Sequence, residues 1–358
     1  MNTDHIDKDF YIKLFVFYNI LILIRGIFDL ESYEDVTTLL SRGIPIALFL
    51  PFSIYIGTNL LAVSNLLRIF FYYLITFSLL LLFSSERNLF DFAHTISPIY
   101  IFILVLPYLK KKYKVVVIIV ALVSFFNDLT NRSNLLNITI AILIMSSFYL
   151  KGIVVFKITK IIRSILLFFP VFFLFLGVFN VFNIFKIGDF TSSFVIEDNR
   201  GQQDLFVDSR TSIYEDVFYE IDKKNAHLFG LGGSGKTETS LIEANWGDFD
   251  VIYKEGRRGT ESGMLNYIQW GGALGGLIYF LLFVKSSYLG IYNSKNWLSV
   301  MLGLWLAYKA LFSFIEDALV FNIYSLFIFI PMGLCFNKKF RGLRNSQIYR
   351  YVNFIFNK

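Results

Sequence analysis

The chain has little of what most soluble proteins depend on. Its 358 residues include one cysteine, Cys335, three histidines and six prolines. A single cysteine excludes an internal disulfide framework and a zinc cluster built on cysteines. Only 17% of the residues are charged and 56% are hydrophobic, whereas soluble domains have about 25% and about 45–50%. With a mean hydropathy of +0.59, the composition predicts a membrane protein.

Long apolar runs predict an all-α polytopic membrane protein. A helix needs roughly 20 apolar residues to cross the hydrocarbon core of a bilayer, and stretches such as 66–83 and 161–185 reach that length. We expect about ten spans, at 10–30, 43–57, 66–83, 92–109, 115–126, 135–150, 161–185, 263–284, 297–315 and 318–336. The second and fifth are short, so we expect them to extend into polar flanks, to tilt or to re-enter the membrane.

The charged loops between these spans alternate in sign. Basic residues gather at 110–114, 151–163, 285–295 and 338–350, and acidic or mixed ones at 31–35, 86–91, 128–132, 186–262 and 316–317. Because lysine and arginine are enriched in cytoplasmic loops, both termini are predicted inside. The first nine residues lack a basic n-region and a cleavage site, so we interpret them as a cytoplasmic tail and not as a signal peptide.

This topology gives four regions. Seven transmembrane helices occupy residues 1–185, a large extracytoplasmic (periplasmic) loop occupies 186–262, three further helices occupy 263–336, and a basic cytoplasmic tail occupies 337–358. The second region, here called the polar loop, holds 15 of the 27 acidic residues and 9 basic ones, a net charge of −6. The rest of the chain, with 12 acids and 24 bases, carries +12. Topology explains this imbalance, and no nucleic-acid partner is expected.

The polar loop contains the string GLGGSGKT at 230–237, which matches the P-loop pattern of ATPases. In those enzymes a buried strand leads into the loop and backbone N–H groups bind the phosphates. Residues 225–229 are too polar for a buried strand, and the predicted topology places the string away from cytoplasmic ATP. We therefore expect no ATP. Two interpretations stay open: a glycine turn in which Lys236 binds a phosphate or pyrophosphate, or a flexible turn.

Three motifs follow one another in and just after the polar loop: DSRTSIYE at 208–215, HLFGLG at 227–232 and ESGMLNYIQWGGALG at 261–275. Together with LTNRSNLL at 129–136, they resemble the O-antigen polymerase/ligase superfamily of bacterial envelopes. The chain departs from that pattern at two positions. Glu261 stands where ligases and many polymerases carry histidine, and Asn131 precedes Arg132 where the family has serine. The first departure favours a polymerase over a ligase.

The resemblance implies a GT-C-like fold and a bacterial oligosaccharide repeat-unit polymerase in the cytoplasmic (inner) membrane, acting in O-antigen, lipopolysaccharide or capsule synthesis. Such an inverting glycosyltransferase moves a growing glycan from undecaprenyl pyrophosphate onto a lipid-linked repeat unit. The expected partners are these lipid-linked oligosaccharides, membrane lipids, a flippase and a chain-length regulator. Because no histidine and carboxylate cluster has ligand spacing, we expect a metal-independent reaction without a cofactor.

The resemblance also places the cationic part of the site. Arg132 and Arg210 are expected to bind the pyrophosphate, because a guanidinium group binds phosphate oxygens bidentately and stays charged. Arg257, Arg258 and Lys236 are further candidate contacts. Other interpretations remain open: a salt bridge within the polar loop for Arg210, and interfacial or lipid anchoring for the other arginines.

The remaining candidates carry proton chemistry or lie within predicted spans. Glu261 is expected to deprotonate the incoming sugar hydroxyl, with His227 in reserve. Arg25 lies four residues before Asp29 and is spaced to pair with it on one helix face. Lys309 lies in the middle of a predicted span, where a charge is costly, so we expect a functional or inter-helix role.

Two rival functions fit the same topology. A ligase of the same superfamily would transfer a finished glycan to a lipid or protein acceptor. A non-enzymatic transporter or flippase would carry its charges and broken helices near the midplane, often in two related halves. The sequence shows no internal repeat, and its chemistry-bearing residues concentrate in the polar loop, which favours an enzyme.

Overall fold

The protein is mainly helical in the part of the chain that the structure describes. The computed structural model describes residues 10–83, 95–127, 131–150, 152–179, 181–183, 195–198, 201–204, 210–238, 258–317, 319 and 321–356. Its helices are α1 (Phe10–Phe28), α2 (Tyr33–Thr38), the π-helix η1 (Leu39–Gly43), α3 (Ile44–Thr58), α4 (Leu60–Phe83), α6 (Pro98–Val105), the 3₁₀ helix η2 (Leu106–Tyr108), α7 (Lys111–Asn127), α8 (Arg132–Ser146), α9 (Ile153–Val178), α10 (Thr211–Lys223), α13 (Gly263–Tyr292), α14 (Trp297–Phe312), α15 (Ile323–Phe336), α16 (Lys338–Gly342) and α17 (Asn345–Phe356).

Five helical stretches among the described residues are long and apolar enough to cross a membrane: Phe10–Phe28, Tyr33–Thr58, Leu60–Leu79, Val154–Val178 and Gly263–Tyr292. Four shorter apolar helices accompany them, at Pro98–Tyr108, Arg132–Ser146, Trp297–Phe312 and Ile323–Phe336. Every predicted span overlaps one of the helices. The expectation of an all-α membrane protein is therefore supported, and the number of membrane crossings stays a prediction.

The two short predicted spans do extend into polar flanks. The span expected at 43–57 belongs to a continuous helical stretch, Tyr33–Thr58, formed by α2, η1 and α3. The span expected at 115–126 is α7, which begins at Lys111 and ends at Asn127. Both additions carry charged or polar side chains, which can reach water from the end of a membrane helix.

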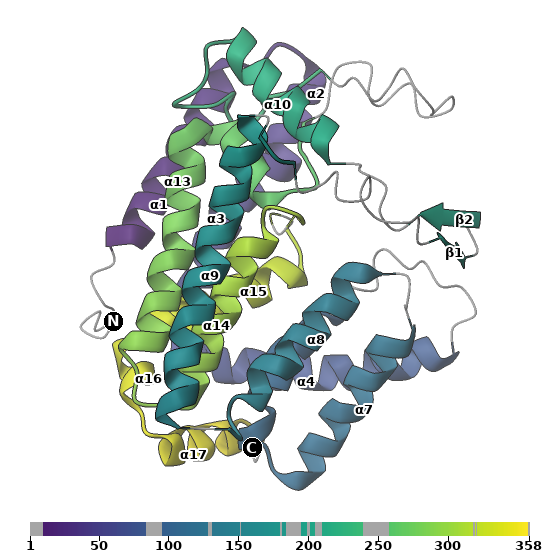
Figure 1. Ribbon diagram of the computed structural model, residues 1–358, viewed down its shortest axis with the longest axis vertical. Coiled ribbons are helices and arrows are strands. Elements are labelled where there is room, and N and C mark those ends of the chain that lie inside the picture. Colours follow the sequence, from purple (N-terminus) through teal and green to yellow (C-terminus); the bar gives the residue numbers. More distant parts are fainter. Residues whose placement is uncertain are drawn as a thin grey trace.

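The tall bundle in Figure 1 contains α1, α3, α9, α13, α14 and α15. Its closest helix pairs are α13 with α14 and α3 with α15. At the second crossing a Cβ atom added to Gly57 would lie 2.8 Å from Gly333 Cα, so only glycines allow this approach. Small residues at such crossings let membrane helices pack through dispersion contacts, because apolar lipid gives no hydrophobic drive for their association.

The outer faces of several helices are apolar. Large hydrophobic side chains are exposed on α1, α4, α7 and α9, among them Phe17, Leu61, Ile69, Ile118, Phe168 and Phe175. Only 17% of the candidate span in α9 is buried inside the protein. A soluble protein rarely exposes an apolar surface of this extent, whereas a bilayer would cover it.

The C-terminal region is more than the basic tail that the sequence predicted, because it folds into α16 and α17. Ile348, Val352 and Ile355 follow the helical repeat and are all buried. The hydroxyl of Tyr351 donates to the carbonyl oxygen of Leu60 at 2.6 Å. In Figure 1, α16 and α17 lie at the opposite end of the bundle from α10 and α2.

The polar loop contains structure that the all-α expectation did not include. Strands β1 (Val195–Asp198) and β2 (Gly201–Asp204) form an antiparallel hairpin in which Val195 pairs with Asp204. The same loop also supplies α10 and the glycine string, both of which pack on the helical bundle. The predicted site residue Arg257 lies outside the described residues.

Candidate functional site

Helix α10 joins the polar loop to the bundle. Its apolar residues Ile213, Val217 and Ile221 recur every four residues, so they share one face, and all three are buried. They pack with Leu265 near the start of α13. Not all of the helix's acidic residues face outward, because Glu220 is buried as well. The helix is therefore held over the start of α13, and Arg210 immediately precedes it.

Residues 313–317, which follow α14, are the point where several distant elements meet. The backbone N–H of Gly263 donates to the carbonyl oxygen of Glu316 at 3.0 Å. The hydroxyl of Ser262 donates to the carbonyl oxygen of Ser313 at 3.0 Å. Ser262 is also the N-cap of α13, so the beginning of that helix is bound directly to this segment.

The two carbonyl groups between Ser313 and Glu316 are bound by two side chains, one on α10 and one just before it. The hydroxyl of Tyr214 donates to the carbonyl oxygen of Phe314 at 2.7 Å, and Arg210 Nε donates to that of Ile315 at 2.9 Å. Burial raises the pKa of Tyr214 to about 12, so this hydroxyl stays protonated and keeps donating at neutral pH. In this contact Arg210 binds a carbonyl oxygen, and the alternative of a salt bridge within the polar loop stays open.

The two acids of the same segment bind different partners. The hydroxyl of Ser133, on α8, donates to Glu316 Oε2. Asp317 Oδ2 lies 2.9 Å from Arg42 Nη2, on η1. Burial raises the pKa of Asp317, and Arg42 opposes that shift. The sequence marked 316–317 only as an acidic loop, because nothing in it shows that α8 and η1 would come to this place.

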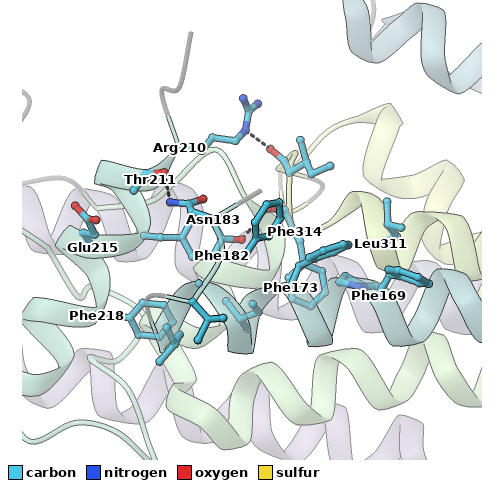
Figure 2. A pocket seen from close by; sticks show the side chains of 17 residues that line it. Phe169, Phe173, Phe182, Asn183, Arg210, Thr211, Glu215, Phe218, Leu311 and Phe314 are labelled. Atoms are coloured by element: carbon cyan, nitrogen blue, oxygen red, sulfur yellow. Dashed lines mark hydrogen bonds between the residues drawn. The ribbon is translucent and has the colours of Figure 1, made fainter. Parts of the chain in front are cut away.

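A cavity of about 800 Å³ lies beside this segment, between the end of α9, α10 and the end of α14. Its lining comprises Phe169, Pro170, Phe173, Leu174, Gly177, Val178, Val181, Phe182, Asn183, Arg210, Thr211, Tyr214, Glu215, Phe218, Leu311, Phe314 and Ile315. Figure 2 shows Arg210, Thr211 and Asn183 on one side of it and Phe169 and Phe173 on another. The amide of Asn183 donates to the hydroxyl of Thr211 at 2.8 Å. An apolar chamber with a polar, cationic rim suits an amphipathic ligand.

Of the residues predicted from the sequence, Arg210 lines this cavity. Arg132 is exposed and is the first residue of α8, whose N-cap Asn131 accepts from the backbone N–H of Asn134 at 3.0 Å. Glu261 is exposed just before α13. His227 is also exposed, with Nε2 3.4 Å from Asp222 Oδ1. Neither Glu261 nor His227 is among the described residues that line the cavity.

Arg258 is held by two carboxylates. Its Nη2 lies 3.0 Å from Asp35 Oδ1, and its Nη1 lies 2.8 Å from Glu34 Oε2. Only 12% of the side chain is exposed. With two acids beside it, the guanidinium already has the anionic partners that a pyrophosphate would replace. Arg258 therefore attaches the segment before α13 to α2, and we do not include it in the proposed substrate site.

The glycine string at 230–237 fills a break in α13. At Gly272 the backbone has φ 63° and ψ −162°, so the helix kinks and nearby backbone groups lose their helical partners. The backbone N–H of Leu231 donates to the carbonyl oxygen of Gln269 at 2.7 Å, and that of Gly232 to Trp270 at 2.9 Å. The string thus supplies hydrogen bonds that the kink removes, as buried backbone groups require.

This arrangement bears on both interpretations of the string. The N–H groups of residues 230–233 and of Gly235 are bound to protein carbonyls, that of Gly233 to Ile22 on α1 at 3.1 Å, so these five are not open to a phosphate. The string is buried from Gly230 to Ser234, which argues against a flexible turn, and phosphate binding by Lys236 stays a prediction. Lys236 lies at its end, 4.0 Å from Glu31, in a polar cavity of about 290 Å³.

Lys309 is buried within α14, with 2% of its surface exposed. Its ammonium donates to Asn137 Oδ1 on α8 at 2.6 Å and to the Tyr324 hydroxyl on α15 at 3.0 Å. Five aromatic rings lie within 5.6 Å of it, those of Tyr100, Trp305, Tyr308, Phe312 and Tyr324. The predicted inter-helix role is confirmed, and so is the pairing of Arg25 with Asp29 at 3.6 Å.

Within the described residues, no group of three or more histidine, cysteine or acidic side chains is placed to hold a metal ion. No protein-family model matches the chain, and no curated protein or solved structure matches it either. The family resemblance therefore rests on the motifs alone, and the chemistry has to be argued from the cavity and the residues around it.

Proposed function

We propose that the protein is a polysaccharide polymerase of the O-antigen or capsule type. It transfers a growing glycan from undecaprenyl pyrophosphate onto a lipid-linked repeat unit, in the bacterial cytoplasmic membrane. In this proposal the protein has a GT-C-like architecture with about ten spans, and both termini are cytoplasmic. The polar loop then lies on the periplasmic side, where lipid-linked repeat units would arrive.

The observation that carries the proposal is the position of Arg210 at the polar side of the phenylalanine-rich cavity. A polyprenyl chain needs an apolar channel, and its pyrophosphate needs a cation at the channel mouth. Phe169 and Phe173, on α9, supply the first requirement. The guanidinium of Arg210 supplies the second, because its Nε is fixed on the carbonyl of Ile315 and a guanidinium carries five N–H donors in all.

The chemistry that this arrangement supports is displacement of a pyrophosphate leaving group. Negative charge develops on the pyrophosphate as its bond to the sugar breaks. A cation that is held in place before the reaction stabilises that charge without a cost of reorganisation. Arg132, at the start of α8, is the second cation that the family motif assigns to this role.

The test is complementation of a strain that lacks the gene. We expect Arg210→Ala to abolish long polysaccharide on gels and to leave single lipid-linked repeat units, whereas the exposed Arg344→Ala should behave as wild type. Arg210→Lys should restore only part of the chain length, because lysine keeps the charge but not the bidentate geometry. Membrane levels of each variant are measured in parallel.

A second variant tests the cavity itself. Gly177 lines the cavity, and the nearest atom that an added Cβ would meet there is the carbonyl oxygen of Phe182 at 4.0 Å. A Cβ at Gly177 therefore meets no clash, the rest of the leucine side chain in Gly177→Leu narrows the cavity, and we expect shortened polysaccharide. Normal chains in both Arg210→Ala and Gly177→Leu would rule out the polymerase. Loss of all surface glycan, single units included, would favour a ligase, and altered solute uptake with normal glycan would favour a transporter.

A further inference from the structure

Two of the arginines assigned to the substrate belong to elements that bind adjacent residues, Ile315 and Glu316. Arg210 donates to the carbonyl oxygen of Ile315, the residue before Glu316, at 2.9 Å. Arg132 opens α8, and the next residue, Ser133, donates its hydroxyl to Glu316 Oε2. Glu316 therefore lies next to Ile315, which binds Arg210, and in contact with Ser133, which follows Arg132.

We propose that Glu316, and not Glu261, is the general base that deprotonates the acceptor sugar hydroxyl. The inference rests on the proposed transferase function and assigns a catalytic residue within it. A general base has to reach the hydroxyl within hydrogen-bond distance. Neither glutamate is among the described lining residues, but Glu316 directly follows Phe314 and Ile315, which line the cavity, and it is half-buried, whereas Glu261 is exposed.

The two adjacent acids of the segment are suited to different tasks. Both oxygens of Asp317 already have protein partners, since Oδ2 pairs with Arg42 and Oδ1 accepts from the backbone N–H of Leu319. The partner of Glu316 is the neutral hydroxyl of Ser133. That hydroxyl binds one carboxylate oxygen and orients the group, while a carboxylate has a second oxygen with which to accept a proton. Ser133 is therefore a positioning residue.

The step balances as a single displacement. The acceptor hydroxyl gives its proton to the carboxylate of Glu316, and the oxygen lone pair forms the new bond to the anomeric carbon of the donor sugar. The bond from that carbon to the pyrophosphate oxygen breaks, and its electron pair leaves with the lipid pyrophosphate. Arg210 stabilises the departing charge. The proton on Glu316 then passes to water, which restores the carboxylate.

The experiment measures polymerisation by the purified full-length protein in detergent. The substrate is the lipid-linked repeat unit extracted from the deletion strain. We expect Glu316→Gln to lower the rate at least about 100-fold, since general base catalysis contributes about 10²–10⁴-fold. Glutamine keeps an oxygen that can accept from Ser133 but cannot take the proton. The matched control is Glu238→Gln, an exposed acid paired with Lys223, which should keep the wild-type rate.

Further variants separate catalysis from a purely structural contact. Ser133→Ala removes the hydrogen bond and leaves the carboxylate, so we expect a lower kcat, about 10-fold, with an unchanged KM, and Glu316→Asp should recover part of the rate. Suppose that Ser133→Ala and Glu316→Gln lose the same share of the polymerisation rate and that their unfolding temperatures fall equally. Glu316 would then only hold α8 in place, and the proposal would be overturned.

The remaining outcomes distinguish this inference from the proposed function. A wild-type rate in Glu316→Gln, together with loss in Arg210→Ala, overturns the base assignment and leaves the transferase standing. Loss in Glu261→Gln while Glu316→Gln stays active returns the base to Glu261. If both Arg210→Ala and Glu316→Gln keep the wild-type rate, the proposed function itself fails.

Discussion

The ammonium of Lys309 lies 2.6 Å from the side-chain oxygen of Asn137, which is 172 residues earlier in the chain. Asn137 is four residues after Ser133 on α8, so the two share one helix face. Ser133 binds Glu316, and Asn137 binds Lys309. Helix α8 is therefore attached to α14 and to the segment after it at two successive turns, and these contacts fix the start of the helix, where Arg132 lies.

This pair predicts an order of stability among its variants. Asn137→Ala leaves the buried Lys309 side chain with one fewer acceptor and should lower the free energy of unfolding by about 1–3 kcal/mol, the cost of leaving a buried donor without its partner. Lys309→Met replaces the amine with an apolar side chain of similar length and should cost less. Thermal unfolding in detergent measures both. A Lys309→Met variant less stable than Asn137→Ala would contradict this order.

A second prediction concerns the kink in α13. Gly272 has a φ of 63°, which side chains rarely adopt, and an added Cβ would lie 2.6 Å from Gly230 N. Gly272→Ala should therefore lower the free energy of unfolding by at least about 2 kcal/mol. The matched control is Gly342→Ala, because a Cβ there meets nothing within 4 Å. Equal unfolding temperatures for the two variants would show that the kink tolerates a side chain.

The third prediction uses the buried hydroxyl of Tyr214. Tyr214→Phe leaves the carbonyl of Phe314 without its 2.7 Å hydrogen bond and should cost about 1–3 kcal/mol. The exposed Tyr219→Phe is the control and should cost nothing measurable. Because the pKa of Tyr214 is raised to about 12 by burial, its contribution is present below pH 10 and is lost as the pH rises from about 10 to 12. As the pH rises from about 10 to 12, the unfolding temperature of Tyr214→Phe should therefore fall less steeply than that of the wild type.

The fourth prediction separates the partners of the Arg42–Asp317 pair. Arg42→Gln leaves a mostly buried carboxylate without its cation, so it should destabilise the protein more than Asp317→Asn does. The double variant Arg42→Gln/Asp317→Asn should recover part of the free energy of unfolding that Arg42→Gln loses. Since burial raises the pKa of Asp317, the defect of Arg42→Gln should shrink as the pH falls and the carboxyl group becomes neutral. A defect that grows at low pH would contradict this account.

Apolar runs predicted the helices well, because membrane helices must satisfy their own backbone and show it in uninterrupted hydrophobic sequence. Helix α17 was missed for the opposite reason. Its buried residues Ile348, Val352 and Ile355 are separated by polar ones, and the nearby basic residues gave the region the character of a tail. The hairpin at 195–204 is too short for a period-two pattern to stand out from the surrounding polar sequence.

The sequence predicted the candidate site only in part. Arg210 was found because it belongs to a motif, and it does line the cavity. Glu316 and Ser133 were not singled out, because they lie 183 residues apart and carry no shared pattern. The packing of the glycine string could not be predicted, since its composition is that of a loop. The close approach of Gly230 to the kink at Gly272, and of Gly232 to Gly26 on α1, explains why glycines are needed there, and the sequence marks neither contact.

The break in α13 also affects the order in which the chain assembles. The N–H groups of Ala273 and Leu274 are bound by the carbonyls of His227 and Leu228, at 2.8 and 3.3 Å. These partners precede α13 in the chain and, in the proposed topology, cross the membrane before it does. In that topology the carbonyl groups of His227 and Leu228 reach the outer side before α13 inserts, and we expect α13 to adopt its kinked shape only after they have done so.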